Sequence, residues 1–310
     1  MDNNLTNTQL DDQKMENLRK RTKLSKYIMI AGGVCFGIMA IIFLASGKTT
    51  LGTDSPEGLA AILLALAGFV LLVAGLVVKQ KAGAAQKQIA NNYAQSVLGR
   101  VMDRLDTFDH GKHVDKYYIN QDFGFPKYDC TGFCGDYVRG VLRGVPMEFC
   151  EFELQEKHVT EDKDGDTDVS YKTVFYGVIV VCRHNLALSD AVVATQFKTY
   201  ENAYNADSEA FYNAFSVRCK SGQDAALAFT PDYRQKLLEL SAERGNRFAV
   251  RFLQDGTLLL VIKDMNLFEM GKSENTAQLV EKLEKEMVAF TNILDKLAIP
   301  AQKLTDPRNI

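Results

Sequence analysis

The fold is decided by two apolar stretches, YIMIAGGVCFGIMAIIFLAS (Tyr27–Ser46) and GLAAILLALAGFVLLVAGLVV (Gly58–Val78). Neither contains a charged side chain, and each has about the 20 residues that a helix needs to cross the hydrocarbon core of a bilayer. Only Gly47–Glu57 separates them. Residues 27–78 therefore predict a transmembrane helical hairpin with both chain ends on one side of a membrane.

Basic residues flank this hairpin at its two outer ends. They are Arg19, Lys20, Arg21, Lys23, Lys26, Lys79, Lys81 and Lys87. The loop between the apolar stretches has only Lys48. Because Lys and Arg favour the cytoplasmic side, we expect both termini in the cytoplasm and the loop outside. A cleaved signal peptide is the competing interpretation, but the first stretch exceeds the ~7–15 residues of a signal-peptide apolar core.

The rest of the chain is organised around the hairpin. We expect residues 1–26 to be a polar and then basic cytoplasmic arm, loose over its first 18 residues. A helical stripe predicts a membrane-proximal helix over 79–108. Residues 109–300 are numerous enough to bury a core of their own, so they predict a cytoplasmic domain, and 301–310 form a tail.

The spacing of apolar residues predicts an α+β fold for this domain. Strands are expected at Tyr137–Leu142, Met147–Gln155, Val174–Cys182, Ala214–Arg218 and Ala225–Phe229, with a hairpin over Arg247–Ile262. Helices are expected at Thr230–Arg244 and, as a C-terminal amphipathic helix, at Asn275–Leu297. The pattern predicts a mainly antiparallel sheet with packed helices. By fold analogy alone, it also suits a pleckstrin-homology-like barrel.

Composition excludes few functions. A net charge of −3 gives no argument for a nucleic-acid partner. The six cysteines are irregularly spaced in a chain of 310 residues, which makes a disulfide framework unexpected. In the cytoplasm these thiols would be reduced.

Four local patterns, in this order, resemble a known family. They are Cys134-Gly-Asp-Tyr-Val-Arg-Gly140, Val174-Phe-Tyr-Gly-Val178, Phe211-Tyr-Asn-Ala-Phe215 leading into Ala226–Pro231, and the hairpin Arg247–Ile262. Behind two membrane helices, they resemble the bacterial family of unknown function numbered 3137, over most of residues 80–265. The resemblance implies a membrane-associated bacterial protein. Together with the predicted hairpin, it leads us to expect a multi-pass protein of the bacterial inner membrane with both termini in the cytoplasm. It implies no activity and no catalytic residue.

Two familiar motifs fail on inspection. Ser46-Gly-Lys-Thr-Thr50 resembles the end of a phosphate-binding loop, but the required earlier glycine is replaced by Ile42. The acidic stretch Asp162–Asp168 lacks the glycine and glutamate of an EF-hand, since Thr167 and Thr173 occupy those positions. A solvated hairpin tip explains this stretch, with a non-standard weak cation site as the alternative.

Two groups of side chains could in principle bind a metal. They are Cys130, Cys134 and Cys150 with His158, and His110 with His113. The C-x3-C spacing differs from the common zinc knuckle, so we interpret these residues as small buried thiols and as histidines of a surface loop, with metal binding as the alternative. The sequence therefore predicts no catalytic, cofactor-binding or metal-binding residue, and no cofactor.

A binding surface is more readily placed at Phe123–Val145. This stretch combines glycines and aromatic residues with Asp136, Arg139 and Arg143. Glycine-rich irregular backbone beside a rigid sheet often positions binding residues, and the arginines could meet anionic lipid head groups. A purely structural crossover is the competing interpretation.

Three functions remain open. The first is a membrane-anchored binding module for a lipid head group, peptide or partner protein. The second is a membrane-tethered enzyme whose site is assembled from dispersed residues. The third is an oligomeric scaffold, because the small residues of Gly33–Gly37 and Ala61–Ala65 allow close helix contact, either within the hairpin or between copies.

Overall fold

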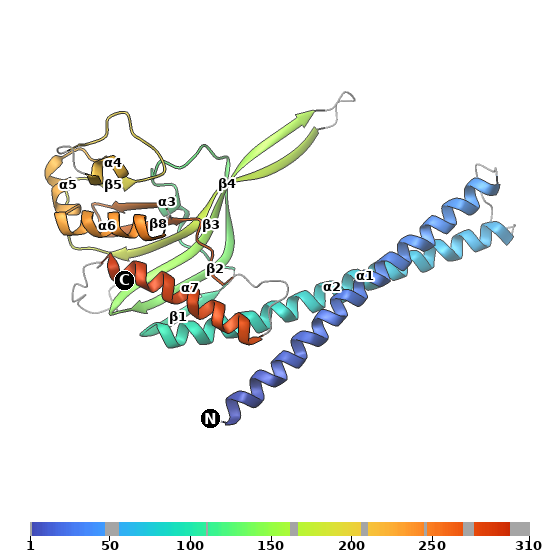
Figure 1. Cartoon of the computed structure of the whole chain (residues 1–310). Coiled ribbons are helices and arrows are strands. Elements are labelled where there is room, and N and C mark those ends of the chain that lie inside the picture. The colour runs from blue at the N-terminus through green and yellow to red at the C-terminus, as the bar shows by residue number, and fades with distance from the viewer. Residues whose placement is uncertain are drawn as a thin grey trace. The chain divides into compact units, whose positions relative to one another are not determined.

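The computed structural model describes residues 2–46, 56–109, 111–161, 167–205, 210–244, 247–268 and 276–297. It divides into two compact units (Figure 1). The first consists of Met1–Ala94 with Met270–Glu281, and the second of Gln95–Glu269 with Lys282–Ile310. Residues 47–55 of the loop expected at Gly47–Glu57, and the tail expected at 301–310, lie outside the described residues, and the helix after this loop begins at Pro56.

Two long helices dominate the first unit. Helix α1 extends over Asp2–Ser46 and α2 over Pro56–Val101. The loose arm expected over residues 1–18 is therefore wrong, because α1 begins at Asp2. Part of the reason is that the arm packs: Met15 is buried, and the hydroxyl of Tyr93 on α2 donates a hydrogen bond to Asp11 Oδ2 at 3.0 Å. The two helices thus remain paired beyond their apolar stretches.

Small residues let the two helices approach closely. A Cβ added at Gly32 would lie 2.8 Å from the carbonyl oxygen of Gly68, so no side chain fits there. Along α2, Ala61, Gly68, Gly75 and Ala82 recur every seven residues, the repeat of a coiled coil. By contrast, a Cβ at Gly33 or Gly37 would meet no described atom within 4 Å. The helix contact expected at Gly33–Gly37 is made at Gly32 instead.

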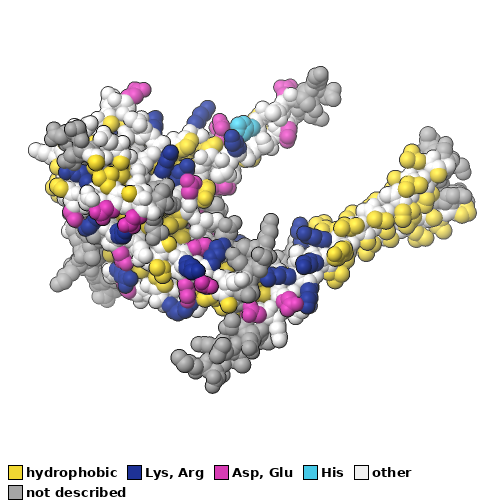
Figure 2. Space-filling view, in the orientation of Figure 1, with side chains coloured by type: hydrophobic (Ala, Val, Ile, Leu, Met, Phe, Trp, Pro, Cys, Tyr) yellow, Lys and Arg dark blue, Asp and Glu magenta, His cyan; other side chains and the backbone are white. Residues whose placement is uncertain are grey.

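Apolar side chains surround both helices over the predicted spans. Ile41, Leu44, Leu63 and Phe69 are among the exposed ones. Figure 2 shows this apolar region with Lys and Arg side chains beside it. Both helices are long and apolar enough to cross a membrane, and a soluble helix would keep a polar face. The two helices therefore suggest membrane association.

The second unit is built on an antiparallel sheet of eight strands in the order β1-β2-β3-β4-β8-β7-β5-β6. The strands are β1 Arg104–Asp109, β2 Cys130–Leu142, β3 Val145–Glu161, β4 Thr167–Arg183, β5 Val192–Thr195, β6 Ser216–Arg218, β7 Phe248–Phe252 and β8 Thr257–Lys263. The predicted α+β class with an antiparallel sheet is confirmed. The described sheet is open, with β1 and β6 at its edges, unlike the barrel of the pleckstrin-homology analogy.

Five helices accompany this sheet among the described residues. They are α3 Lys116–Ile119, α4 Ala210–Ala214, α5 Gly222–Ala228, α6 Pro231–Arg244 and α7 Thr276–Lys296. The strand expected at Ala225–Phe229 is wrong, because that segment lies largely in α5. Ser221 caps this helix by accepting a hydrogen bond from the backbone N–H of Gln223. The helix expected over 79–108 is also too long, since α2 ends at Val101 and β1 begins at Arg104.

Both faces of the sheet are covered. On the helical face, Phe290 of α7 packs against Phe149 of β3 with ring centroids 4.7 Å apart. On the opposite face, which we call the loop face, the segment 111–129 packs Phe125 against both Phe152 and Phe175. Strands β7 and β8 are therefore buried on both sides, and the alternation expected along Arg247–Phe252 does not leave one face in water.

Strands β3 and β4 continue past the rest of the sheet. We call this extension, residues 156–161 and 167–172, the β-ribbon. Figure 1 shows it leaving the body of the second unit as two strands. The turn expected at Asp164-Gly165 lies outside the described residues.

Candidate functional site

The loop face contains a cavity of about 160 Å³. We call it the arginine pocket because Arg104 of β1, Arg139 of β2 and Arg183 of β4 line it. The remaining polar side chains of its wall are Asp106, Tyr118, Glu148 and Thr257. These residues come from five neighbouring strands, β1, β2, β3, β4 and β8, and from α3, so the pocket exists only in the assembled sheet.

Strand register brings the central residues of the pocket together. Arg139 lies opposite Glu148 in the β2–β3 pair, and Glu148 lies opposite Val181 in the β3–β4 pair. Tyr118 reaches the pocket from α3, whose first turn is capped by Asp115. A type I′ turn joins β2 to β3, with φ of 52° at Arg143 and 75° at Gly144.

The acidic groups of the pocket already have partners. Asp106 binds Arg104 through two hydrogen bonds of 2.7 and 3.2 Å. Glu148 Oε2 accepts a hydrogen bond of 2.5 Å from the hydroxyl of Tyr137. Burial and this hydrogen bond raise the pKa of Tyr137 well above its usual value, so the phenol stays a donor at neutral pH.

Two of the three arginines lack a carboxylate partner. Arg183 donates to the backbone oxygen of Asp255 at 3.1 Å and to Thr257 Oγ1 at 3.4 Å, both of which are uncharged. Arg139 is exposed, and it forms no hydrogen bond or ion pair with any residue that the structure describes. The pocket therefore presents two guanidinium groups that no described carboxylate binds, and its wall has three arginines against two carboxylates.

The three residues expected at a binding surface do not converge. Arg139 lines the pocket. Arg143 sits in the turn after β2 and forms an ion pair of 3.4 Å with Asp295 of α7. Asp136 lies at the irregularity between Phe133 and Tyr137 and is not part of the pocket wall. Only Arg139 is therefore placed where a small ligand could be held.

A family model described as "Protein of unknown function (DUF3137)" matches residues 172–299. The match covers 128 of the 310 residues, and over this segment the chain is similar to the DUF3137 family. The match extends from β4 to α7, whereas the resemblance was expected over most of 80–265. No curated protein and no solved structure matches the chain.

The DUF3137 segment contains only part of the arginine pocket. Arg183 and Thr257 lie inside it, whereas Arg104, Arg139 and Glu148 lie before it. The motif Cys134–Gly140 also precedes the matched segment. The similarity to the DUF3137 family supplies no activity for any of these residues.

Sequence reasoning missed most of the pocket. Arg104, Glu148 and Arg183 are separated by tens of residues and have no common motif. One signal was available, since Glu148 lies between the apolar residues Met147 and Phe149, on a strand that also contains Glu151 and Glu153. A charge at that place on a buried strand indicates a polar site on one face of the sheet.

The candidate metal ligands are dispersed. Cys150 is buried in the core, Cys130 Sγ lies 3.6 Å from Gln155 Oε1, and His158 is on the β-ribbon. His113 stacks on Phe133 at 3.9 Å. Within the described part of the chain, no three His, Cys, Asp or Glu side chains are placed to hold a metal ion. His110, the side chain of Cys134 and residues 162–166 lie outside that part.

A second polar cluster on the loop face has a structural role. Asp122 binds Arg218 at 2.5 Å and accepts a hydrogen bond of 3.0 Å from the N–H of Gly124. Arg251 donates to the backbone oxygen of Asp122 at 2.9 Å, and the Arg218 guanidinium lies 4.7 Å from the ring centroid of Tyr200. These contacts attach the loop around Asp122 to β6 and β7.

Proposed function

We propose that this protein is a membrane-anchored binding module whose arginine pocket takes a small anionic group, a phosphate or a carboxylate. The observation that supports it most is Arg139, an exposed guanidinium on the wall of a cavity and without a partner among the described residues. Guanidinium matches the geometry of both anions because it can donate two parallel hydrogen bonds.

The charge balance of the pocket supports an anion over a cation. Its wall has three arginines against Asp106 and Glu148, and each of these carboxylates already accepts hydrogen bonds. Its volume of about 160 Å³ is below the ~300–1,000 Å³ typical of pockets for drug-sized ligands. A single phosphate or carboxylate group suits this space better than a nucleotide cofactor.

The anchor belongs to the same proposal. Two apolar helices with basic flanks support a multi-pass protein of a bacterial inner membrane, with both termini in the cytoplasm. A cytoplasmic reporter joined after Ile310, and one joined before Met1, should both be active. Activity of a periplasmic reporter at either end would contradict this orientation.

The anion could be soluble or part of a lipid head group, and thermal unfolding distinguishes them. The full chain in zwitterionic detergent would be heated with inorganic phosphate, with short-chain phosphatidylglycerol, or with short-chain phosphatidylcholine. Stabilisation by phosphate and phosphatidylglycerol indicates a general anion site, and stabilisation by phosphatidylglycerol alone indicates a head-group site. Phosphatidylcholine is the control, because it has the same kind of acyl chains but a zwitterionic head group.

Two variants test whether stabilisation of the protein by an anion arises in the arginine pocket. Arg139→Gln should abolish it, whereas Arg143→Gln, which removes a similar charge outside the pocket, should preserve it. Equal stabilisation of both variants, or none in the parent protein, would contradict the proposal.

A further inference from the structure

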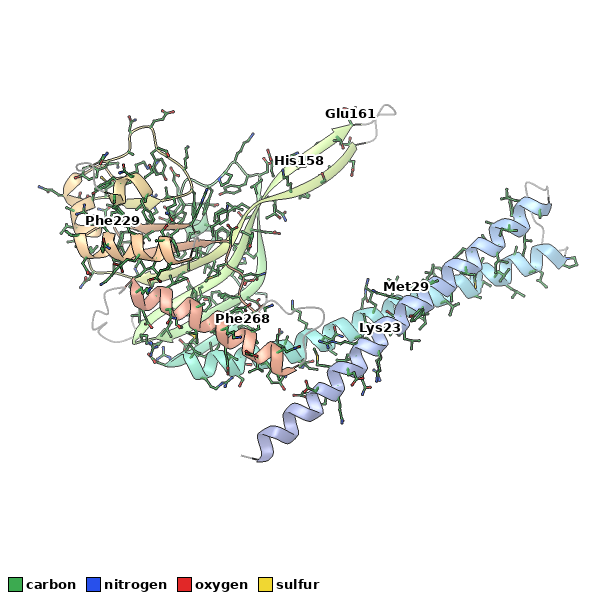
Figure 3. All side chains as sticks on the ribbon, viewed as in Figure 1. Lys23, Met29, His158, Glu161, Phe229 and Phe268 are labelled. Atoms are coloured by element: carbon green, nitrogen blue, oxygen red, sulfur yellow. The ribbon has the colours of Figure 1, made fainter. Side chains whose placement is uncertain are left out.

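The β-ribbon stands apart from the folded body of its unit. Its residues pair only with each other among the described strands, and nearly all of them are exposed. Two strands alone are marginally stable in water, so an extended ribbon of this kind is a natural docking element. Figure 3 labels His158 and Glu161 along it.

The two faces of the β-ribbon differ in character. One face has Val159 directly opposite Val169, with Tyr171 next along β4, and Val159 and Tyr171 are 55% and 56% exposed. The other face is polar and consists of Glu156, His158, Thr160, Asp168, Ser170 and Lys172. The first face also contains Lys157, opposite Tyr171, and Glu161, opposite Thr167, so Val159, Val169 and Tyr171 form an apolar patch on it that no described residue covers.

Its two edges also differ. The edge of β3 is partly occupied, because the backbone N–H of Lys157 donates to Asp129 Oδ2 at 2.8 Å and Asp129 N–H donates to the Gln155 oxygen at 2.9 Å. On β4, pairing with β8 begins only at Gly177. The edge of β4 over Thr167–Thr173 has no partner strand in the described part of the chain.

We propose that this edge pairs with the same edge of a second copy of the chain. A two-fold axis through Ser170 makes an antiparallel pair in which Asp168 of each copy lies opposite Lys172 of the other. Val169 then lies opposite Tyr171. Opposite charges in directly opposed positions stabilise antiparallel strands, and the axis supplies this contact twice.

The register follows from strand geometry. Along the edge of a strand, only every second residue points its backbone N–H and C=O groups outward. Two identical edges can therefore form antiparallel hydrogen bonds only if the two-fold axis places one residue opposite its own copy. An axis at Asp168 or Lys172 would oppose like charges. An axis at Tyr171 would place Asp168 opposite Val174 and Lys172 opposite Ser170, and both of these partners are uncharged. Within the described strand, only the axis at Ser170 places Asp168 of one copy opposite Lys172 of the other.

The product is a four-stranded sheet with an apolar patch on one face. Val159, Val169 and Tyr171 of the two copies form this patch, and the central edges disappear. The pairing does not involve the arginine pocket, so Arg139→Gln should leave it unchanged.

Exchanging the two charges tests the contact between Asp168 and Lys172 of the two copies. The mass of the full chain in detergent would be measured by sedimentation. Asp168→Lys and Lys172→Asp should each weaken dimerisation by about tenfold or more, because each replaces two attractive pairs with two repulsive ones. The double variant should restore it. Glu161→Lys makes the same charge change as Asp168→Lys on the other strand and should have no effect. A dimer unaffected by the single variants, or a parent chain that stays monomeric, would overturn the proposal.

A disulfide tests the axis directly. Opposed residues of an antiparallel pair have Cα atoms about 4.5–5.5 Å apart, within the range of a disulfide. Ser170→Cys should therefore give a covalent dimer on oxidation, above the background of the native cysteines. Thr160→Cys, on the same face but on β3, should not. Equal crosslinking of the two variants would contradict the assigned axis.

Discussion

At the scale of single residues, His184 shows how the fold selects a protonation state. Its Nε2 lies 2.8 Å from the backbone oxygen of Leu253, and its Nδ1 lies 3.1 Å from the N–H of Leu186. One tautomer of the neutral ring satisfies both contacts, as donor and acceptor respectively. Burial, opposed by the contact with Leu253, lowers the pKa of His184 below its usual value.

His184 should therefore make stability depend on pH. Below pH ~6.5 the unfolded chain takes up a proton that the folded chain excludes, so the free energy of unfolding should fall as pH decreases, until the folded pKa is reached. Denaturant unfolding between pH 5 and 8 measures this slope. His184→Gln should flatten it, whereas the exposed His158→Gln should not. An unchanged slope in His184→Gln would show that other groups are responsible.

At the scale of secondary-structure elements, α7 was predictable and α5 was not. Leu279, Leu283, Met287 and Phe290 recur at helical spacing, and all four are buried. In contrast, Ala225–Phe229 is short and apolar, and periodicity alone cannot distinguish a strand from a helix there. The helix is favoured by the N-terminal cap that Ser221 provides, and a cap made by one side chain is easily overlooked in a sequence.

The buried stripe of α7 should contribute strongly to stability. Leu283→Ala should cost about 2–5 kcal/mol and Phe290→Ala about 3–5 kcal/mol, because each leaves a cavity and Phe290 also loses its contact with Phe149. Val288 is 53% exposed on the same helix, so Val288→Ala is a matched control with an expected cost of about 0.5 kcal/mol or less. Chemical denaturation of the three variants gives the comparison. Near-neutral values for Leu283→Ala and Phe290→Ala would mean that α7 is not held against the sheet.

At the scale of the whole molecule, the division into two units was partly visible in the sequence. The apolar stretches identified the two helices that are long and apolar enough to cross a membrane, since length and composition suffice for that inference. The order of the strands was not predictable, because β8 and β7 insert between β4 and β5 through contacts remote in sequence. For the same reason, only Arg139 of the arginine pocket could be named in advance.

The second unit should fold without the helical hairpin. A fragment starting at Gln95 contains all eight described strands and α7, and it should be soluble and unfold cooperatively. Calorimetry of this fragment provides the measurement. Loss of a cooperative transition would mean that the sheet depends on α1 and the first part of α2.

The most direct test of the central claim is a calorimetric titration of the full chain with inorganic phosphate in zwitterionic detergent. Our account predicts saturable binding to the parent protein and to Arg143→Gln, and a loss of affinity of about tenfold or more in Arg139→Gln. Binding should also weaken as salt is added, because the contact is ionic and the pocket is open to water. Equal affinity in Arg139→Gln and the parent protein would contradict the assignment of the arginine pocket, as would a parent protein that binds neither phosphate nor short-chain phosphatidylglycerol.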